Sequence, residues 1–230
     1  MKKLKGEIKG ELEVQGDLEL TGDLKVEKWI NVTGSIICNG YFIEAGSYIK
    51  AGSYIKAGSY IKAGDFIKAG YFIEAGDFIE AGYFIEAGDF IKAGSYIKAG
   101  YFIEAGSYIK DGDFIKAGYS IEAGYFIEAG DFIKAGSYIK AGYSIEAGNS
   151  IKAGSYIKAG SYIKAGNSIE AGNSILAQLW IKCENSLKAR LYIYAGIKTW
   201  SEIVEGDDLI KCGKLESGEI KYGKLVETGI

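Results

Sequence analysis

Histidine and proline are both absent from this chain of 230 residues. Without histidine the commonest metal ligand and general base is missing, and carboxylates interleaved with lysines make poor metal sites. The three cysteines, Cys38, Cys183 and Cys212, show no CxxC spacing. We therefore expect no metal and no cofactor, and we expect reduced thiols in a cytoplasmic protein. Cys38 and Cys183 lie where the repeat has valine or alanine, so we expect these two to be small buried hydrophobes.

Long apolar runs and a strong charge of one sign are missing as well. The net charge is −3, and acidic and basic residues are well mixed along the chain. No basic patch could follow a phosphate backbone, which argues against a nucleic-acid partner. The basic N-terminus, residues 1–7, leads into no apolar segment, and no run is long enough to cross a bilayer. We therefore expect no signal peptide and no membrane partner.

What the chain does contain is one hexapeptide, repeated without interruption from Tyr41 to Gly172. Its consensus is [S/D/Y/N]-[F/Y/S]-Ile-[K/E]-Ala-Gly, as in Ser47–Gly52. A short fixed period with constant apolar positions is typical of a solenoid, in which each unit buries its inner face only against its neighbours. The glycines are numerous but periodic, so they indicate turns rather than a disordered linker.

Each hexad is predicted to be a short strand followed by a bend. Side chains alternate along a strand, so Ile49 and Ala51 share one face while Tyr48 and Lys50 share the other. Lys or Glu at the fourth position predicts that this second face meets solvent and that Ile and Ala point inward. Gly52 follows at the bend, where we expect it to provide a positive φ. The predicted core ladder comprises Ile43, Ala45, Ile49, Ala51, Ile55 and Ala57.

The predicted fold class is all-β, a single-stranded parallel β-solenoid. A helix is excluded because a period of six matches no helical stripe and each repeated glycine would cost a helix roughly 1 kcal/mol. Stacked coils would pair their strands in parallel, about 4.8 Å apart. We favour a triangular coil of about 18 residues, because one large and one small inward side chain per side would fill little of a square. A four-sided coil of about 24 residues is the alternative.

We expect one continuous domain with three stretches. Residues 1–40 form diverged hexads and a cap, and a phase slip predicts an extra residue near 37–40. Residues 41–196 form the regular solenoid. Residues 197–230 form a capping segment with short strands at 201–204, 209–212, 219–222 and 224–226, while Trp180 and Trp200 cover the open end of the core. Atypical ends of this kind protect the exposed strand edges of a solenoid.

Three resemblances to known families follow from these patterns. The six-residue spacing of isoleucine resembles that of the hexapeptide acyltransferases, but those enzymes use a catalytic histidine and inserted loops. Because this chain has neither, we expect it not to be an enzyme. The segment Gly16-Asp17-Leu18-Glu19-Leu20-Thr21-Gly22-Asp23-Leu24-Lys25-Val26 resembles the repeats of bactofilins. Those are bacterial cytoskeletal β-helices that polymerise end to end, so the resemblance implies a self-assembling structural protein. The central block resembles uncharacterised bacterial and phage proteins with A-G-[D/N]-I-K-A repeats.

The first two hexad positions vary together. Phenylalanine at the second position follows only Asp or Tyr, tyrosine follows only Ser, and serine follows only Tyr or Asn. This linkage favours duplication at the DNA level followed by drift, with a designed consensus protein as the alternative.

The outward aromatic residues are the candidate interaction residues. The predicted interaction ladder comprises Tyr48, Tyr54, Tyr60, Phe66, Phe72 and Phe78. Stacked rings could simply stabilise the strands, could mediate self-association into a dimer or polymer, or could bind a polysaccharide or a protein partner. We expect a non-enzymatic structural or interaction scaffold. The alternative, a surface-binding module, predicts that one side of the solenoid is enriched in one residue type.

Overall fold

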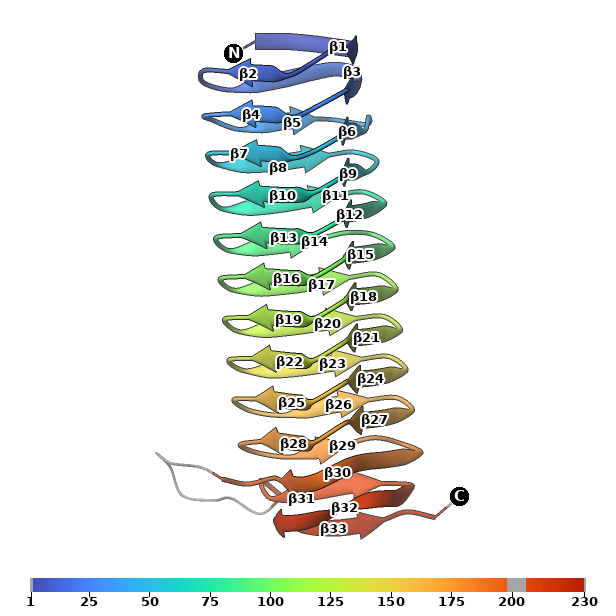
Figure 1. Cartoon of the computed structure of the whole chain (residues 1–230). Helices are drawn as coiled ribbons and strands as arrows, with labels where there is room; N and C mark the ends of the chain where they lie inside the picture. Colours follow the sequence, from blue (N-terminus) through green and yellow to red (C-terminus); the bar gives the residue numbers. More distant parts are fainter. Residues whose placement is uncertain (1, 198–205, 230) are drawn as a thin grey trace. The chain divides into compact units, whose positions relative to one another are not determined.

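A computed structural model describes residues 2–197 and 206–229. The chain divides into two compact units, unit 1 (Met1–Asp113) and unit 2 (Phe114–Ile230). In the described residues the regular structure is entirely β-strand, and the strands pair in parallel as a β-solenoid (Figure 1). The predicted fold class is confirmed. Within the two described ranges no helix is long and apolar enough to cross a membrane.

The strands of unit 1 are β1 (Lys2–Ile8), β2 (Leu12–Val14), β3 (Leu18–Val26), β4 (Ile30–Val32), β5 (Ile36–Cys38), β6 (Ile43–Ala45), β7 (Ile49–Ala51), β8 (Tyr54–Ala57), β9 (Ile61–Ala63), β10 (Phe66–Ala69), β11 (Phe72–Ala75), β12 (Phe78–Ala81), β13 (Phe84–Ala87), β14 (Phe90–Lys92), β15 (Tyr96–Ala99), β16 (Phe102–Ala105) and β17 (Tyr108–Asp111).

The strands of unit 2 are β18 (Phe114–Ala117), β19 (Ser120–Ala123), β20 (Phe126–Ala129), β21 (Phe132–Ala135), β22 (Tyr138–Ala141), β23 (Ser144–Ala147), β24 (Ser150–Ala153), β25 (Tyr156–Ala159), β26 (Ile163–Ala165), β27 (Ser168–Ala171), β28 (Ser174–Ala177), β29 (Ile181–Lys182), β30 (Ser186–Tyr194), β31 (Leu209–Cys212), β32 (Lys214–Tyr222) and β33 (Lys224–Glu227).

The strand register shows a three-sided coil. Strand β10 pairs with β7 on one edge and β13 on the other, so that Ile67 lies opposite Ile49 and Ile85. Equivalent positions are therefore about 18 residues apart, and each coil uses three hexads. The triangular coil is confirmed and the four-sided alternative is wrong.

Three sides can be named within unit 1. Side A contains β2, β4, β7, β10, β13 and β16, and side B contains the first part of β3 followed by β5, β8, β11, β14 and β17. Side C contains the second part of β3 followed by β6, β9, β12 and β15. Each side thus repeats the same strand once per coil.

The core consists of isoleucine and alanine columns that run from coil to coil. The hexad isoleucines are at most 1% exposed, and Ile67 lies directly against Ile49 while Ala69 lies against Ala51. Burial of each isoleucine side chain is worth roughly 2–3 kcal/mol. A large and a small residue on every side fill the narrow triangular interior, which is why so short a repeat can make a core.

The repeated glycine is required for a reason other than the predicted positive φ. None of the hexad glycines from Gly46 to Gly172 has a positive φ, so the expectation of a left-handed corner is wrong. Instead, a Cβ added to Gly64 would overlap the carbonyl oxygen of Gly46 in the preceding coil, far inside the 3.0 Å that real Cβ atoms respect. Successive coils approach so closely at this corner that only a hydrogen atom fits between their backbones.

The extra residue predicted near residues 37–40 is confirmed. Leu24 pairs with Ile43 and Ile30 pairs with Ile49, one residue more than the spacing that holds between Ile43 and Ile61. The additional residue lies in the turn between β5 and β6, where Gly40 has φ 87°. This position does need the left-handed conformation that glycine adopts readily.

The C-terminal strands extend the solenoid although the hexad period is lost. Strand β31 matches the predicted strand 209–212, and β32 and β33 contain the predicted strands 219–222 and 224–226. They pair in parallel with β29, β30 and β31. Trp180 does not cover the core as predicted, because its ring stacks outward on Tyr162 at 4.3 Å. Trp200 and the predicted strand 201–204 lie outside the described residues.

All three cysteines are free and buried, which confirms the predicted burial of Cys38 and Cys183. Burial raises the pKa of the Cys38 thiol to about 11 and that of the Cys183 thiol to about 12, and it also raises the pKa of Cys212. A thiolate is therefore disfavoured in the folded chain at physiological pH.

These thiols predict a loss of stability at alkaline pH. A thiol whose pKa rises on folding binds its proton more tightly in the folded state, so its stabilising effect is complete below the unfolded pKa of about 8.5 and is lost as pH rises towards 11–12. Replacing the three cysteines with alanine, the consensus residue of the block, should reduce the fall in Tm between pH 8 and pH 11. An unchanged fall would mean that the thiols do not contribute. The native thiols should also resist iodoacetamide until the chain is unfolded.

Candidate functional site

The predicted core ladder lies wholly inside unit 1. Its members are Ile43, Ala45, Ile49, Ala51, Ile55 and Ala57. The three isoleucines are fully buried and the three alanines are at most 3% exposed. They come from β6, β7 and β8, so they supply one isoleucine and one alanine to each of the three sides. The interior is thus filled at these positions, and a site for another molecule must use the outward side chains.

The predicted interaction ladder is distributed over all three sides rather than along one. Its members are Tyr48, Tyr54, Tyr60, Phe66, Phe72 and Phe78. They belong to successive strands, so the structure brings them together only in pairs. Tyr48 stacks on Phe66 on side A with ring centroids 4.7 Å apart, and the pairs on sides B and C lie 4.1 and 4.6 Å apart. Each pair is part of a longer column.

The second hexad position builds one aromatic column on each side of unit 1. The columns are Trp29, Tyr48, Phe66, Phe84 and Phe102 on side A; Tyr54, Phe72, Phe90 and Tyr108 on side B; and Phe42, Tyr60, Phe78 and Tyr96 on side C. Neighbouring rings stack 4.1–5.5 Å apart and within 19° of parallel, with one exception on side B described below. Since each ring covers the face of the next, the rings present mainly their edges to solvent. All three sides carry such a column of tyrosine and phenylalanine rings, so the rings favour no side as a binding face.

The other outward positions also contact the same position in the next coil. At the fourth position, Lys68 binds Glu86 at 2.6 Å. At the first position, the Ser59 hydroxyl donates a hydrogen bond to Asp77 at 2.7 Å. Exposed pairs of this kind contribute only about 0–1 kcal/mol each, but they recur along the chain. All three outward positions of the hexad are therefore used to hold coils together.

Tyrosine hydroxyls connect the aromatic columns to the Lys and Glu side chains at the fourth hexad position. The Tyr96 hydroxyl donates a hydrogen bond to Glu80 at 3.3 Å, and Lys98 binds the other oxygen of the same carboxylate at 3.1 Å. Burial and the negative charge of Glu80 raise the pKa of Tyr96. The phenol therefore remains protonated and donates its hydrogen bond over the physiological pH range.

Serine replaces the ring at several second positions of unit 2. They are Ser120, Ser144, Ser150, Ser168 and Ser174. Ser144 is nonetheless only 2% exposed. The ring of the preceding Tyr143 lies 5.0 Å from Phe126 and 6.3 Å from Tyr162, which are the rings on either side of Ser144 in its column. The corner tyrosine therefore replaces the missing ring, and this gives a structural reason why serine follows tyrosine in the repeat.

A pair of corner substitutions tests this replacement. Tyr143→Ala should lower the free energy of unfolding by about 1–2 kcal/mol, because it removes the ring that lies against both Phe126 and Tyr162. Tyr125 occupies the same corner one coil earlier, is 56% exposed, and is followed by a phenylalanine that already fills its column. Tyr125→Ala should therefore cost about 0.5 kcal/mol or less in the same urea titration. Equal costs would show that Tyr143 does not replace the missing ring.

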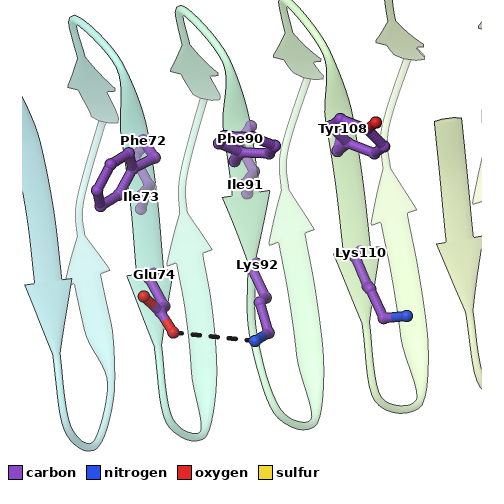
Figure 2. Close-up of a pocket in the computed structure, with 8 residues that line it drawn as sticks. All are labelled: Phe72, Ile73, Glu74, Phe90, Ile91, Lys92, Tyr108 and Lys110. Carbon is purple, nitrogen blue, oxygen red and sulfur yellow. Dashed lines mark ion pairs between the residues drawn. The ribbon is translucent and has the colours of Figure 1, made fainter. Parts of the chain in front are cut away.

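One break in the aromatic columns of unit 1 opens a hollow on side B. Phe72 and Phe90 are 6.5 Å apart and inclined at 63°, so neither ring can cover the face of the other. A cavity of about 390 Å³ lies at this break, with Phe72, Phe90 and Tyr108 along its upper part and Glu74, Lys92 and Lys110 below them (Figure 2). This volume is within the range of small-molecule sites. The hollow is the strongest candidate site in unit 1.

The charges beside the hollow are mostly positive. In the regular hexads of side B in unit 1, the fourth positions are Lys56, Glu74, Lys92 and Lys110, three lysines to one glutamate. Glu74 binds Lys56 at 3.4 Å but reaches Lys92 only at 3.9 Å, as the dashed line in Figure 2 shows. Because the Lys92 ion pair is long and exposed, this ammonium group can exchange Glu74 for another anion at little cost.

Asp111 is a residue whose burial the repeat pattern obscured. It occupies the alanine position of its hexad at the end of β17 and is only 4% exposed. Its carboxylate accepts a hydrogen bond from the backbone N–H of Asp113 at 2.8 Å. The sequence shows that Asp111 departs from the consensus alanine. Because the consensus treats this position as constant, it misses a buried carboxylate. In the described part of the chain, no three His, Cys, Asp or Glu side chains gather as a metal site would require.

Comparison of this chain with protein-family models, with curated proteins and with solved structures gives no match. The similarity to bactofilins and to the A-G-[D/N]-I-K-A proteins therefore stays a prediction from short motifs.

Proposed function

We propose that this chain is a non-enzymatic structural scaffold that associates with further copies of itself. The observation that carries the proposal is that every outward position of the hexad contacts the same position one coil away: rings on rings, lysine on glutamate, and serine on aspartate. Cohesion along the coil is thus the main use of the surface. A surface selected for chemistry would need side chains held apart from such contacts.

Self-association is supported by the exposed apolar side chains of β33. Leu225 and Val226 are 38% and 43% exposed, and β33 pairs with β31 along one of its edges. Among the described strands none pairs with the other edge of β33, and an apolar strand with such an edge is a template for a strand of another chain. A head-to-tail contact of this kind repeats without closing and produces a filament. The bactofilin-like motif in residues 16–26 would imply the same end-to-end growth, in the bacterial cytoplasm, where free buried thiols are stable.

The test is the molar mass by light scattering after size exclusion, over a hundredfold range of concentration. We expect the mass to rise above the 24.8 kDa of one chain as concentration increases. The double variant Leu225→Lys, Val226→Lys should abolish this rise through charge repulsion at β33. Tyr83→Lys, at a corner that is 62% exposed, is the matched control and should leave the rise intact. A strict monomer at all concentrations would refute self-association, and loss of growth in the Tyr83 variant alone would indicate side-by-side packing.

A second candidate function is that of a surface-binding module for a polysaccharide or a protein partner. The stacked columns give it little support, because the ring faces are covered. The hollow on side B favours it, since there the stack is interrupted beside a loosely paired lysine.

A further inference from the structure

The hollow on side B stands out because it interrupts an otherwise regular pattern within unit 1. The hexads around Phe66 and Phe90 are identical, Asp-Phe-Ile-Lys-Ala-Gly at 65–70 and at 89–94. Phe66 is stacked on both faces, with Tyr48 and Phe84 each 4.7 Å away. Phe90 stacks on Tyr108 at 5.2 Å but is inclined at 63° to Phe72, and it is 43% exposed. The same residues thus make a closed column in one place and an open one in the other.

The ion pairs of these two hexads differ in length, and the hexad with the open aromatic column also has the longer ion pair. Lys68 holds Glu86 at 2.6 Å, whereas Lys92 holds Glu74 at 3.9 Å. Side B therefore combines an uncovered aromatic surface with a loosely paired ammonium group on the same strand. The second and fourth positions of a strand are about 7 Å apart on one face, so a ligand lying along the strand can contact the rings with one end and the Lys92 ammonium group with the other.

We propose that the hollow between Phe72 and Phe90 binds a planar aromatic ring that carries a carboxylate. The ring lies against Phe72 and Phe90 and restores the stacking that the column lacks, while the carboxylate binds the Lys92 ammonium group in place of Glu74. Lys110 adds positive charge on the same side of the hollow (Figure 2). The inference develops the second candidate function, surface binding, and is independent of self-association.

A neutral sugar fits this hollow less well than an aromatic acid. Stacking of two aromatic rings is worth about 0.5–1.5 kcal/mol beyond the area that they bury, and a carboxylate adds a charge-assisted hydrogen bond to the lysine. A neutral sugar would use the ring faces but would leave the loosely paired Lys92 ammonium group without an anionic partner from the ligand. Charge complementarity therefore decides between the two ligand classes.

The probe for the test is 2-naphthoate, with 2-naphthamide as its uncharged analogue, titrated against the whole chain by NMR. The titration is run at a concentration where light scattering has established the mass, so that binding and self-association are measured separately. We expect saturable binding of naphthoate and weaker binding of naphthamide. No saturable binding, or equal binding of the two probes, would overturn the proposal.

Matched variants then locate the site. Phe72→Leu with Phe90→Leu keeps apolar volume but removes the rings, and it should weaken naphthoate binding by roughly tenfold. Phe66→Leu with Phe84→Leu makes the same change in the closed column and should have little effect. Lys92→Met should weaken naphthoate but not naphthamide, whereas Lys68→Met should change neither. Similar losses in the side A and side B variants would mean that binding is not at this hollow.

Discussion

Alanine in place of Gly82 is expected to destabilise the solenoid by more than about 4 kcal/mol, although the position is exposed. The added Cβ would overlap the carbonyl oxygen of Gly64 in the preceding coil and would lie 3.1 Å from its carbonyl carbon. Both atoms belong to backbone that is hydrogen-bonded within the stack, so the coils would have to separate. Urea unfolding followed by circular dichroism measures the loss.

A second glycine separates crowding from conformation. Gly10 has φ 89°, but no atom lies within 4 Å of the place that a Cβ would occupy. The only cost of alanine there is therefore the unfavourable positive φ. Gly10→Ala should cost about 1–2 kcal/mol. If Gly82→Ala cost no more than Gly10→Ala, the close approach of the coils would not be what requires glycine.

Alanine in place of Asp111 is expected to act in the opposite direction and to raise the free energy of unfolding by about 2 kcal/mol. The carboxylate is buried at a position that is alanine in the preceding coils of the repeat block, at Ala57, Ala75 and Ala93. The hydrogen bond that it accepts from Asp113 is not essential, because that N–H also donates to the carbonyl oxygen of Ser95 at 3.0 Å. Its removal therefore restores the consensus core without leaving that donor unpaired.

Two further variants test whether the buried charge of Asp111 is what lowers the free energy of unfolding. Asp111→Asn keeps a carbonyl oxygen in place and removes the charge, so it should recover part of the gain. Ala93 lies one coil earlier on the same side and is 4% exposed. Ala93→Asp should destabilise the chain by a similar amount. A neutral or destabilising Asp111→Ala would show that the carboxylate has a stabilising partner that outweighs its burial.

The fold class followed from the sequence because one signal was repeated many times. Alternation of Ile49 and Ala51 with outward Tyr48 and Lys50 determines which face is buried in a strand. A period of six residues excludes a helix, and the volumes of isoleucine and alanine favour the smaller triangular coil. The extra residue before β6 was also predictable, because it shifts the phase of every later isoleucine.

The candidate site was predictable only in part. Six aromatic residues were correctly read as outward, but consecutive hexads such as those of Tyr48 and Tyr54 lie on different sides. Which rings meet depends on the coil period, and the hollow depends on the inclination of Phe90 to Phe72, although the hexad of Phe90 is identical to that of the regularly stacked Phe66. The interaction of Tyr143 with Phe126 and Tyr162 likewise requires the coils to be stacked before it can be recognised.

By itself, the sequence determined the strand, its buried face and the parallel stacking, because these depend on residue alternation and on period alone. Only the tertiary structure decided why glycine recurs. The hexad glycines are required by the carbonyl oxygen of another coil and not by their own φ angle, and such a contact between residues far apart in the chain leaves no local signal. The same holds for the outward columns: the sequence supplies the rings and charges, and the coil geometry decides which rings are covered by a neighbour and which, as at Phe90, stay exposed.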